Sequence, residues 1–454
     1  MATGDNGNLT PAQMLPGSRA SVQAPDPTKG AFFWLSAFFL VYCARPGDWT
    51  PGLSYIPLAK ITAIFAMWGL FRSIGRTKRT LKDIPKEGRL LVTMIGLLFL
   101  GGFLSPVWRG GAVSRTIEFS KIIVAWSLVF LLITTFDRLR RIIFVQAASV
   151  VVICIAALIK GHDIPRLNGA IGGLYSNPND LAFAIVLSLP FALGFMVTAK
   201  NMLLKAAWCF GMLIMLVTIF ETASRAGFID LVICGSVTLY YFAIKGKRTY
   251  LLVGTVLLGV LIAVTVGGKL YDRFEALEGD STSEENAYGS YQARMFLMGR
   301  ALDAIESYPI LGIGVQNFPT YSLIWHDVHM TYLQVAAEGG IPVAIIYLLF
   351  FRCAFVNLKV LRKRTDLDPD IVLFVGALSS SLVGFVVGAL FAPETYQYFP
   401  YFAVAFTATL LQTIKEQDRD KGAGPVNTPP PNKARHFLEV YADRDRTSPV
   451  APVR

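Results

Sequence analysis

Two of the four histidines in this chain, His326 and His329, lie close together where a long apolar run begins. An imidazole with an ordinary pKa of about 6.5 takes a proton from an attacking hydroxyl at neutral pH, so either is a candidate general base. A metal site is a weaker interpretation, because His326, Asp327 and His329 supply at most three local ligands. A structural pair of histidines at a membrane surface is the other alternative.

Three arginines are candidates for binding an anion. Arg225 stands in a very short segment between two apolar runs, where its planar guanidinium suits a phosphate bidentately. An ion pair with Glu221, or a role as an interfacial anchor, is the alternative. Arg294 and Arg300 fall on different faces of a helix predicted over 292–307, so at most one points at a site. The apolar repeat Leu297, Ala301, Leu302 and Ile305 predicts that helix, and Pro309 ends it.

A polar loop over residues 160–180 precedes another apolar run. Arg166 has no obvious partner in the sequence and is the stronger ligand candidate there. Asn177, Asn179 and Asp180 come just before the run, so helix capping explains much of their presence.

The elements that must position these residues are membrane helices. The chain has 454 residues, of which 54% are hydrophobic and 16% charged, with a mean hydropathy of +0.50. This composition excludes a water-soluble globule. Apart from the shorter first run, each apolar run is long enough to cross a hydrocarbon layer of about 30 Å. The fold class is therefore an all-α polytopic membrane protein of about twelve spans, near 31–44, 53–71, 90–106, 117–135, 142–159, 181–198, 203–221, 226–244, 250–267, 329–351, 371–391 and 396–413.

The distribution of basic residues predicts the orientation. The net charge is +11, and one set of connecting segments holds 20 Lys and Arg against 11 in the opposite set. The positive-inside rule then places both termini in the cytoplasm and the loop 268–328 on the outer face. We expect a membrane domain over 31–413 that contains this large, partly helical loop. Residues 1–30 and 414–454 are predicted to be disordered cytoplasmic ends.

Cofactor chemistry finds little support in the sequence. The five cysteines lie in or beside apolar runs without metal-ligand spacing, and we interpret them as small core hydrophobes. There is no phosphate-binding loop of the GxxxxGK[ST] type and no DxD-type acidic pair in the outer loops. We therefore expect neither a cofactor nor a metal, and nucleic acid is not an expected partner.

Four short motifs occur in a specific order over roughly residues 160–345. The motifs are Arg166–Gly169 leading into Asn177–Asn179, Ser224–Gly227, Tyr308–Gly314 with Asn317–Phe318, and His329–Gln334 continuing to Glu338–Gly340. Together they resemble the bacterial O-antigen ligases and the related O-antigen polymerase-like and protein O-glycosylation ligase-like membrane proteins. One difference from the family is Met330, where asparagine usually follows the histidine.

The resemblance implies roles for these residues. His329 would be the catalytic base, and Arg225, Arg294 and Arg166 would bind a lipid-linked pyrophosphate. We expect the site to be supported by His326, Tyr332, Gln334, Asn177 and Asn179. Glu338 is either a helix-packing carboxylate or part of a buried polar network.

The function implied is metal-independent, inverting transfer of a glycan from undecaprenyl pyrophosphate to a hydroxyl of lipid A–core. It would take place on the periplasmic face of the bacterial inner membrane. A glycan polymerase or protein O-glycosylation ligase of the same family is the nearest alternative. A secondary transporter of an organic anion, with Lys60 and the arginines along its path, is the alternative from another class.

Overall fold

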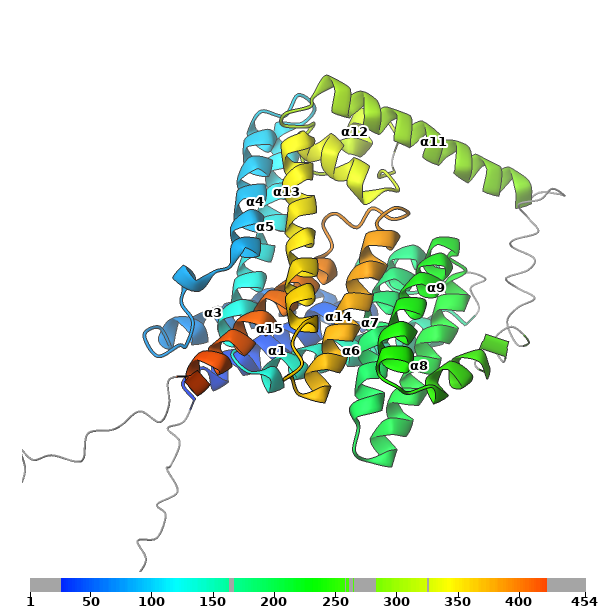
Figure 1. Ribbon diagram of the computed structural model, residues 1–454. Helices are drawn as coiled ribbons and strands as arrows, with labels where there is room; N and C mark the ends of the chain where they lie inside the picture. Colours follow the sequence, from blue (N-terminus) through cyan, green and yellow to red (C-terminus); the bar gives the residue numbers. More distant parts are fainter. Residues whose placement is uncertain are drawn as a thin grey trace, which may run out of the picture.

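The computed structural model describes residues 26–162, 167–257, 259–260, 264, 283–324 and 326–422. These residues form helices and loops without any strand, which confirms the all-helical class (Figure 1). The helices are α1 (Lys29–Ala44), α2 (Pro46–Trp49), η1 (Leu53–Tyr55), α3 (Leu58–Arg72), η2 (Leu81–Asp83), α4 (Lys86–Phe103), α5 (Arg109–Leu132), α6 (Phe136–Lys160), η3 (Gly173–Tyr175), α7 (Pro178–Thr198), α8 (Met202–Thr222), α9 (Arg225–Leu239), η4 (Tyr240–Lys245), α11 (Ser283–Ser307), α12 (Phe318–Ser322), α13 (Thr331–Arg362), α14 (Pro369–Gly388) and α15 (Tyr398–Gly422).

Eleven of the twelve predicted apolar runs coincide with helices, and the run 250–267 lies partly outside the described residues. The second run starts late, since Leu53–Tyr55 is a separate short turn and Pro57 precedes α3. By length and composition, six helices of the described chain are long and apolar enough to cross a membrane. They are α6, α7, α8, α9 continued by η4, α13 and α14.

Helices α7 and α14 form the centre of the bundle. The most apolar windows of these two helices are 72% and 78% buried inside the protein, against 28% for α8. Helix α14 packs on both α7 and α9, while α13 packs on α4 and α15. The apolar surface of α8 is therefore left for lipid, whereas α7 and α14 hold the site-bearing elements in fixed positions.

Helix α11 lies across one end of the bundle, above α12 and the start of α13 (Figure 1). It ends at Ser307, as predicted from Pro309, but begins at Ser283 rather than residue 292. Leu297 and Ala301 are buried with Ala304 in a small apolar cluster that seats this helix. Leu302 is 55% exposed, so Ala304 rather than Leu302 completes the buried face of this helix.

Two further details differ from the sequence-based expectation. Helix α15 continues to Gly422, past the boundary at residue 413, and Arg364 of the loop between α13 and α14 pairs with Asp418 on its last turns. Cys43, Cys154 and Cys234 are buried, whereas Cys209 is exposed on α8 and is not a core residue.

Candidate active site at one end of the bundle

Arg225 is the first residue of α9 and follows a very tight turn. Ala223 takes the left-handed conformation with φ of 48°, and the Ser224 hydroxyl caps α9 by accepting from the Gly227 amide at 3.0 Å. A Cβ on Gly227 would lie 2.6 Å from Ala182, so glycine lets α9 pack closely on α7. The turn therefore fixes Arg225 relative to the centre of the bundle. An Arg225–Glu221 ion pair does not occur among the described residues.

Arg294 and Arg300 of α11 have different surroundings, as predicted. Arg300 pairs with Asp303 at 3.2 Å and donates to the Tyr321 carbonyl at 3.2 Å, so it ties α11 to α12. Arg294 is half-buried, and burial together with the nearby charge of Arg225 lowers its pKa. In the described chain neither Arg294 nor Arg225 has a carboxylate in ion-pair contact. Two neighbouring like charges without acidic partners among the described residues are suited to binding an anion.

His329 lies in the loop just before α13, partly buried. Its Nδ1 donates to the Asp327 carbonyl at 3.0 Å, because a carbonyl can only accept. The hydrogen bond therefore leaves Nε2 with a free lone pair. Burial lowers the pKa of His329, and the charges of Arg294 and His326 act in the same direction. The ring is thus neutral at pH 7 and ready to accept a proton.

The predicted supporting residues near His329 divide into two groups. His326 is exposed beside it. Tyr332 donates to the Val386 carbonyl at 2.8 Å, and Gln334 accepts from the Thr395 hydroxyl at 2.8 Å. The latter two fasten the start of α13 to neighbouring segments and orient His329 indirectly. Met330, which replaces the usual asparagine, packs on the cluster under α11.

Helix α13 is kinked near its start. Gly340 has non-helical angles of φ 79° and ψ 171°, and Pro342 follows it. A proline cannot donate to the preceding turn, so carbonyls are freed there. The loop 308–318 satisfies them through Ile313 N to Ala337 O and Gly314 N to Glu338 O, both at 2.9 Å.

Glycines make this contact possible. Gly312 has φ of 66°, and a Cβ there would lie 2.5 Å from the Glu338 backbone, while one on Gly340 would meet the loop backbone at 2.4 Å. The Glu338 side chain is buried and accepts from the Phe318 amide at 3.4 Å and from the Tyr396 hydroxyl. Of the two interpretations of Glu338, the buried polar network is therefore correct.

The remaining predicted ligands belong to the segment 160–180, which precedes and begins α7. The Asn177 side chain caps α7 by accepting from the Asn179 amide at 3.0 Å, so the capping role holds. Asn177 and Asp180 also line a cavity that Asp327 and Gln334 reach. Arg166 lies outside the described residues.

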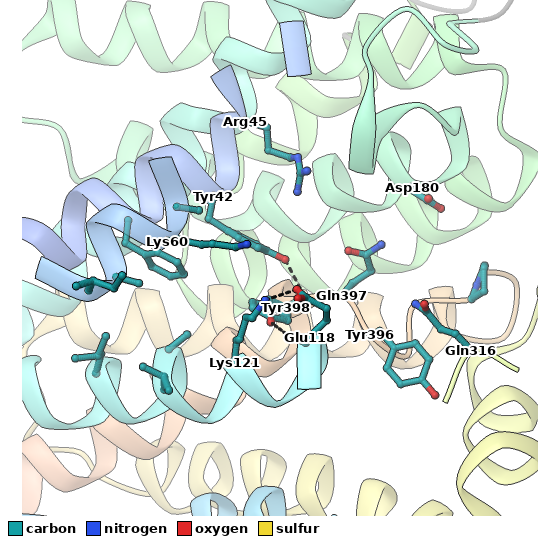
Figure 2. A pocket seen from close by; sticks show the side chains of 18 of the residues that line it. Tyr42, Arg45, Lys60, Glu118, Lys121, Asp180, Gln316, Tyr396, Gln397 and Tyr398 are labelled. Atoms are coloured by element: carbon teal, nitrogen blue, oxygen red, sulfur yellow. Dashed lines mark hydrogen bonds and ion pairs between the residues drawn. The ribbon is translucent and has the colours of Figure 1, made fainter. Parts of the chain in front are cut away.

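This cavity has a volume of about 730 Å³, within the range of ligand sites. Figure 2 shows Tyr42 and Lys60 on one side of it and Asp180, Gln316 and Tyr396 on the other. Burial raises the pKa of the Asp327 carboxyl, and the Asp327 carbonyl bonds to His329. The polar part of the cavity thus adjoins the histidine. Its apolar part is lined by Phe38 of α1, by Ala59, Ala63, Ile64 and Met67 of α3, and by Val124, Ala125 and Leu128 of α5.

Comparison with known proteins adds a family assignment. Residues 210–348 match the family model described as O-antigen ligase. This stretch is therefore similar to the O-antigen ligases. The resemblance expected from the sequence is confirmed there, and the stretch contains Arg225, Arg294 and His329. No curated protein matches the chain.

Residues outside the matched stretch 210–348 also contact the candidate site, and sequence reasoning missed them. The loop 389–397 reaches back to α13, where the Glu394 amide donates to the Thr331 hydroxyl at 2.9 Å. The Tyr396 hydroxyl donates to Glu338. Gln316, which is within the matched stretch, lies on the same side of the cavity as Tyr396 (Figure 2). Glu394 in an otherwise uncharged short loop was the available signal.

Proposed function

We propose that this protein transfers a glycan from undecaprenyl pyrophosphate to a sugar hydroxyl of lipid A–core, with inversion and without a metal. The observation that carries the proposal is that Arg294 lies near both Arg225 and His329. Neither arginine has a carboxylate in ion-pair contact among the described residues, and the Nδ1 hydrogen bond of His329 leaves its Nε2 able to accept a proton. The family match supports a lipid-linked glycan as substrate.

Each group has a defined task in this reaction. Nε2 of His329 removes the proton of the acceptor hydroxyl while its oxygen forms a bond to the anomeric carbon. The bond from that carbon to the pyrophosphate oxygen breaks, and the electron pair leaves with the pyrophosphate. Arg225 and Arg294 stabilise the resulting negative charge. Removing such a contact in enzymes costs about 2.7–4 kcal/mol.

The cavity beside Asp327 supports substrates that come from the bilayer. Its apolar side walls suit a lipid chain, while Lys60, Lys121 and Arg45 bring positive charge to its polar part. Lys121 and Arg45 already pair with Glu118 and Asp48, so Lys60 is the cation in this cavity that has no ion-pair partner in the described chain.

The proposed orientation puts this end of the bundle in the periplasm and both termini in the cytoplasm. The basic segments 72–89, 245–248 and 352–364 support it, because they follow or precede helix ends remote from His329.

Reconstitution of the purified chain with an undecaprenyl-pyrophosphate glycan tests the function. Lipid A–core and free glycan are offered as competing acceptors, and products are resolved by mass. We expect the glycan on lipid A–core with inverted anomeric configuration. Elongated glycan alone would establish a polymerase instead, and solute uptake by the liposomes without transfer would favour a transporter.

The same assay tests the metal-free mechanism. With excess EDTA we expect the initial rate to remain within about twofold, because the arginines neutralise the leaving group. Loss of transfer that is restored by Mg²⁺ or Mn²⁺ would contradict this mechanism.

A further inference from the structure

A second cavity, of about 350 Å³, lies between η4 and the first turns of α14. It is at the end of the bundle remote from His329. Helix α9, which continues into η4, begins with Arg225 at the end of the bundle that holds His329, and α13 begins just after His329. Both run the length of the bundle and bring their final residues, Lys245 and Arg362, to this cavity.

Four cations line the cavity, and three of them lack an acidic partner. Arg364 contacts Asp366 at 2.7 Å and Asp418 at 2.6 Å, which ties this region to α15. No ion pair within the described ranges involves the other three, which are Lys245, Arg248 and Arg362. The cavity therefore has an unbalanced positive charge.

Tyr241 holds two of these cations in place. Arg362 donates to its hydroxyl, and the guanidinium carbon lies 5.6 Å from the ring centroid. Lys245 Nζ is 5.8 Å from the same ring. The π-helical turn η4 aligns Tyr241 with Lys245, and the Arg248 amide closes the turn by donating to the Ala243 carbonyl at 2.9 Å. Such π turns are rare and often occur at functional sites.

The wall of the cavity below these cations is apolar. Leu367, Val372, Leu373 and Val375 supply it, and α14 is one of the six candidate membrane spans. Val372 is 52% exposed and Ile244 on the facing turn is 58% exposed. The basic rim thus continues directly into surface of the kind that contacts lipid chains.

We propose that this cavity binds an anionic phospholipid. The phosphate contacts Lys245, Arg248 and Arg362, and an acyl chain lies along Val372. A soluble phosphate compound would use the charges but would leave the apolar wall uncovered, so a lipid fits both halves of the cavity. This inference is independent of the proposed glycan transfer.

Native mass spectrometry of the detergent-purified full chain tests the proposal. The protein is titrated with phosphatidylglycerol and, separately, with phosphatidylcholine. We expect preferential binding of phosphatidylglycerol by the parent protein and at least a tenfold weakening in the double variant Lys245→Ala/Arg248→Ala. The matched control is Lys359→Ala/Lys363→Ala, which removes two exposed cations from the same end of the bundle but outside the cavity.

Three results would overturn the proposal. One is equal weakening in both double variants, which would indicate diffuse surface charge. Another is unchanged phosphatidylglycerol binding in the cavity variant. The third is competition by glycerol 3-phosphate as strong as that of the lipid. A second variant, Val372→Trp, keeps all the charges and fills the apolar wall, and it should also weaken lipid binding with an unchanged melting temperature.

Discussion

Arg225 and Arg294 lie near each other but belong to helices that are held in place differently. Arg225 follows a tight capped turn, and its helix packs against α7 so closely that Gly227 has no room for a Cβ. Arg294 is on α11, which is seated by a small cluster of side chains at the end of the bundle. The comparison suggests one rigid cation and one adjustable cation, and substitutions can separate these roles.

The largest expected effect comes from His329, the proposed general base. His329→Ala should lower kcat by about 10²–10⁴-fold, because general base catalysis is lost. Donor binding should persist through Arg225 and Arg294, so isothermal titration with an undecaprenyl-pyrophosphate donor should give a Kd near that of the parent. Full transfer by this variant would remove the assignment of the base.

A second prediction compares the arginines directly. Arg225→Lys should lower kcat/KM by about 10²-fold or more, since a point charge on a fixed turn cannot replace a bidentate fork. Arg294→Lys should cost about tenfold, because α11 can move to accommodate the shorter group. Initial rates measured side by side decide this, and equal losses would show that the two supports are equally rigid.

The pH profile gives a finer comparison. Burial and Arg294 hold the pKa of His329 below its ordinary value, so the acidic limb of kcat/KM should lie below pH 6.5. Arg294→Gln removes a positive charge that opposes protonation, and the limb should move to higher pH. Arg225→Gln should leave it in place, because Arg225 is not among the charges that shift His329. A shift in the opposite direction, or the same shift in both variants, would contradict this electrostatic picture.

The smallest effect concerns the seat of α11. Leu297→Ala removes buried methyl groups from the cluster and should raise KM for the donor a few-fold, with kcat nearly unchanged. Leu302→Ala, on the exposed face of the same helix, is the matched control and should behave as the parent. Steady-state kinetics with both variants make the test.

The helices and two of the candidate site residues follow from the same physical reasoning. A charged or titratable side chain at the end of an apolar run is costly unless it has a function, which made Arg225 and His329 candidates, whereas Arg294 was preferred to Arg300 through the resemblance to the O-antigen ligases. The end of α11 was also predictable, because Pro309 cannot continue a helix.

Other parts of the site depend on contacts between distant segments. Nothing near Thr331 in the sequence indicates that its hydroxyl accepts from the Glu394 amide. Likewise, Tyr332 and Gln334 have residue types suited to a substrate, but their polar groups bond to other parts of the fold. The start of α11 was missed because residues 283–291 are mostly polar and show no apolar periodicity.

The backbone contact between the loop 308–318 and the kink of α13 has a consequence for turnover. The backbone hydrogen bonds of this contact and the buried Glu338 hold the loop 308–318 against α13, so this loop is not expected to open between catalytic cycles. Under the proposed glycan transfer, long-chain reactants and products would enter and leave through the side of the cavity that α1, α3 and α5 line. The rate at which reactants and products exchange would then depend on the fluidity of the surrounding bilayer more than on a hinge motion of the protein.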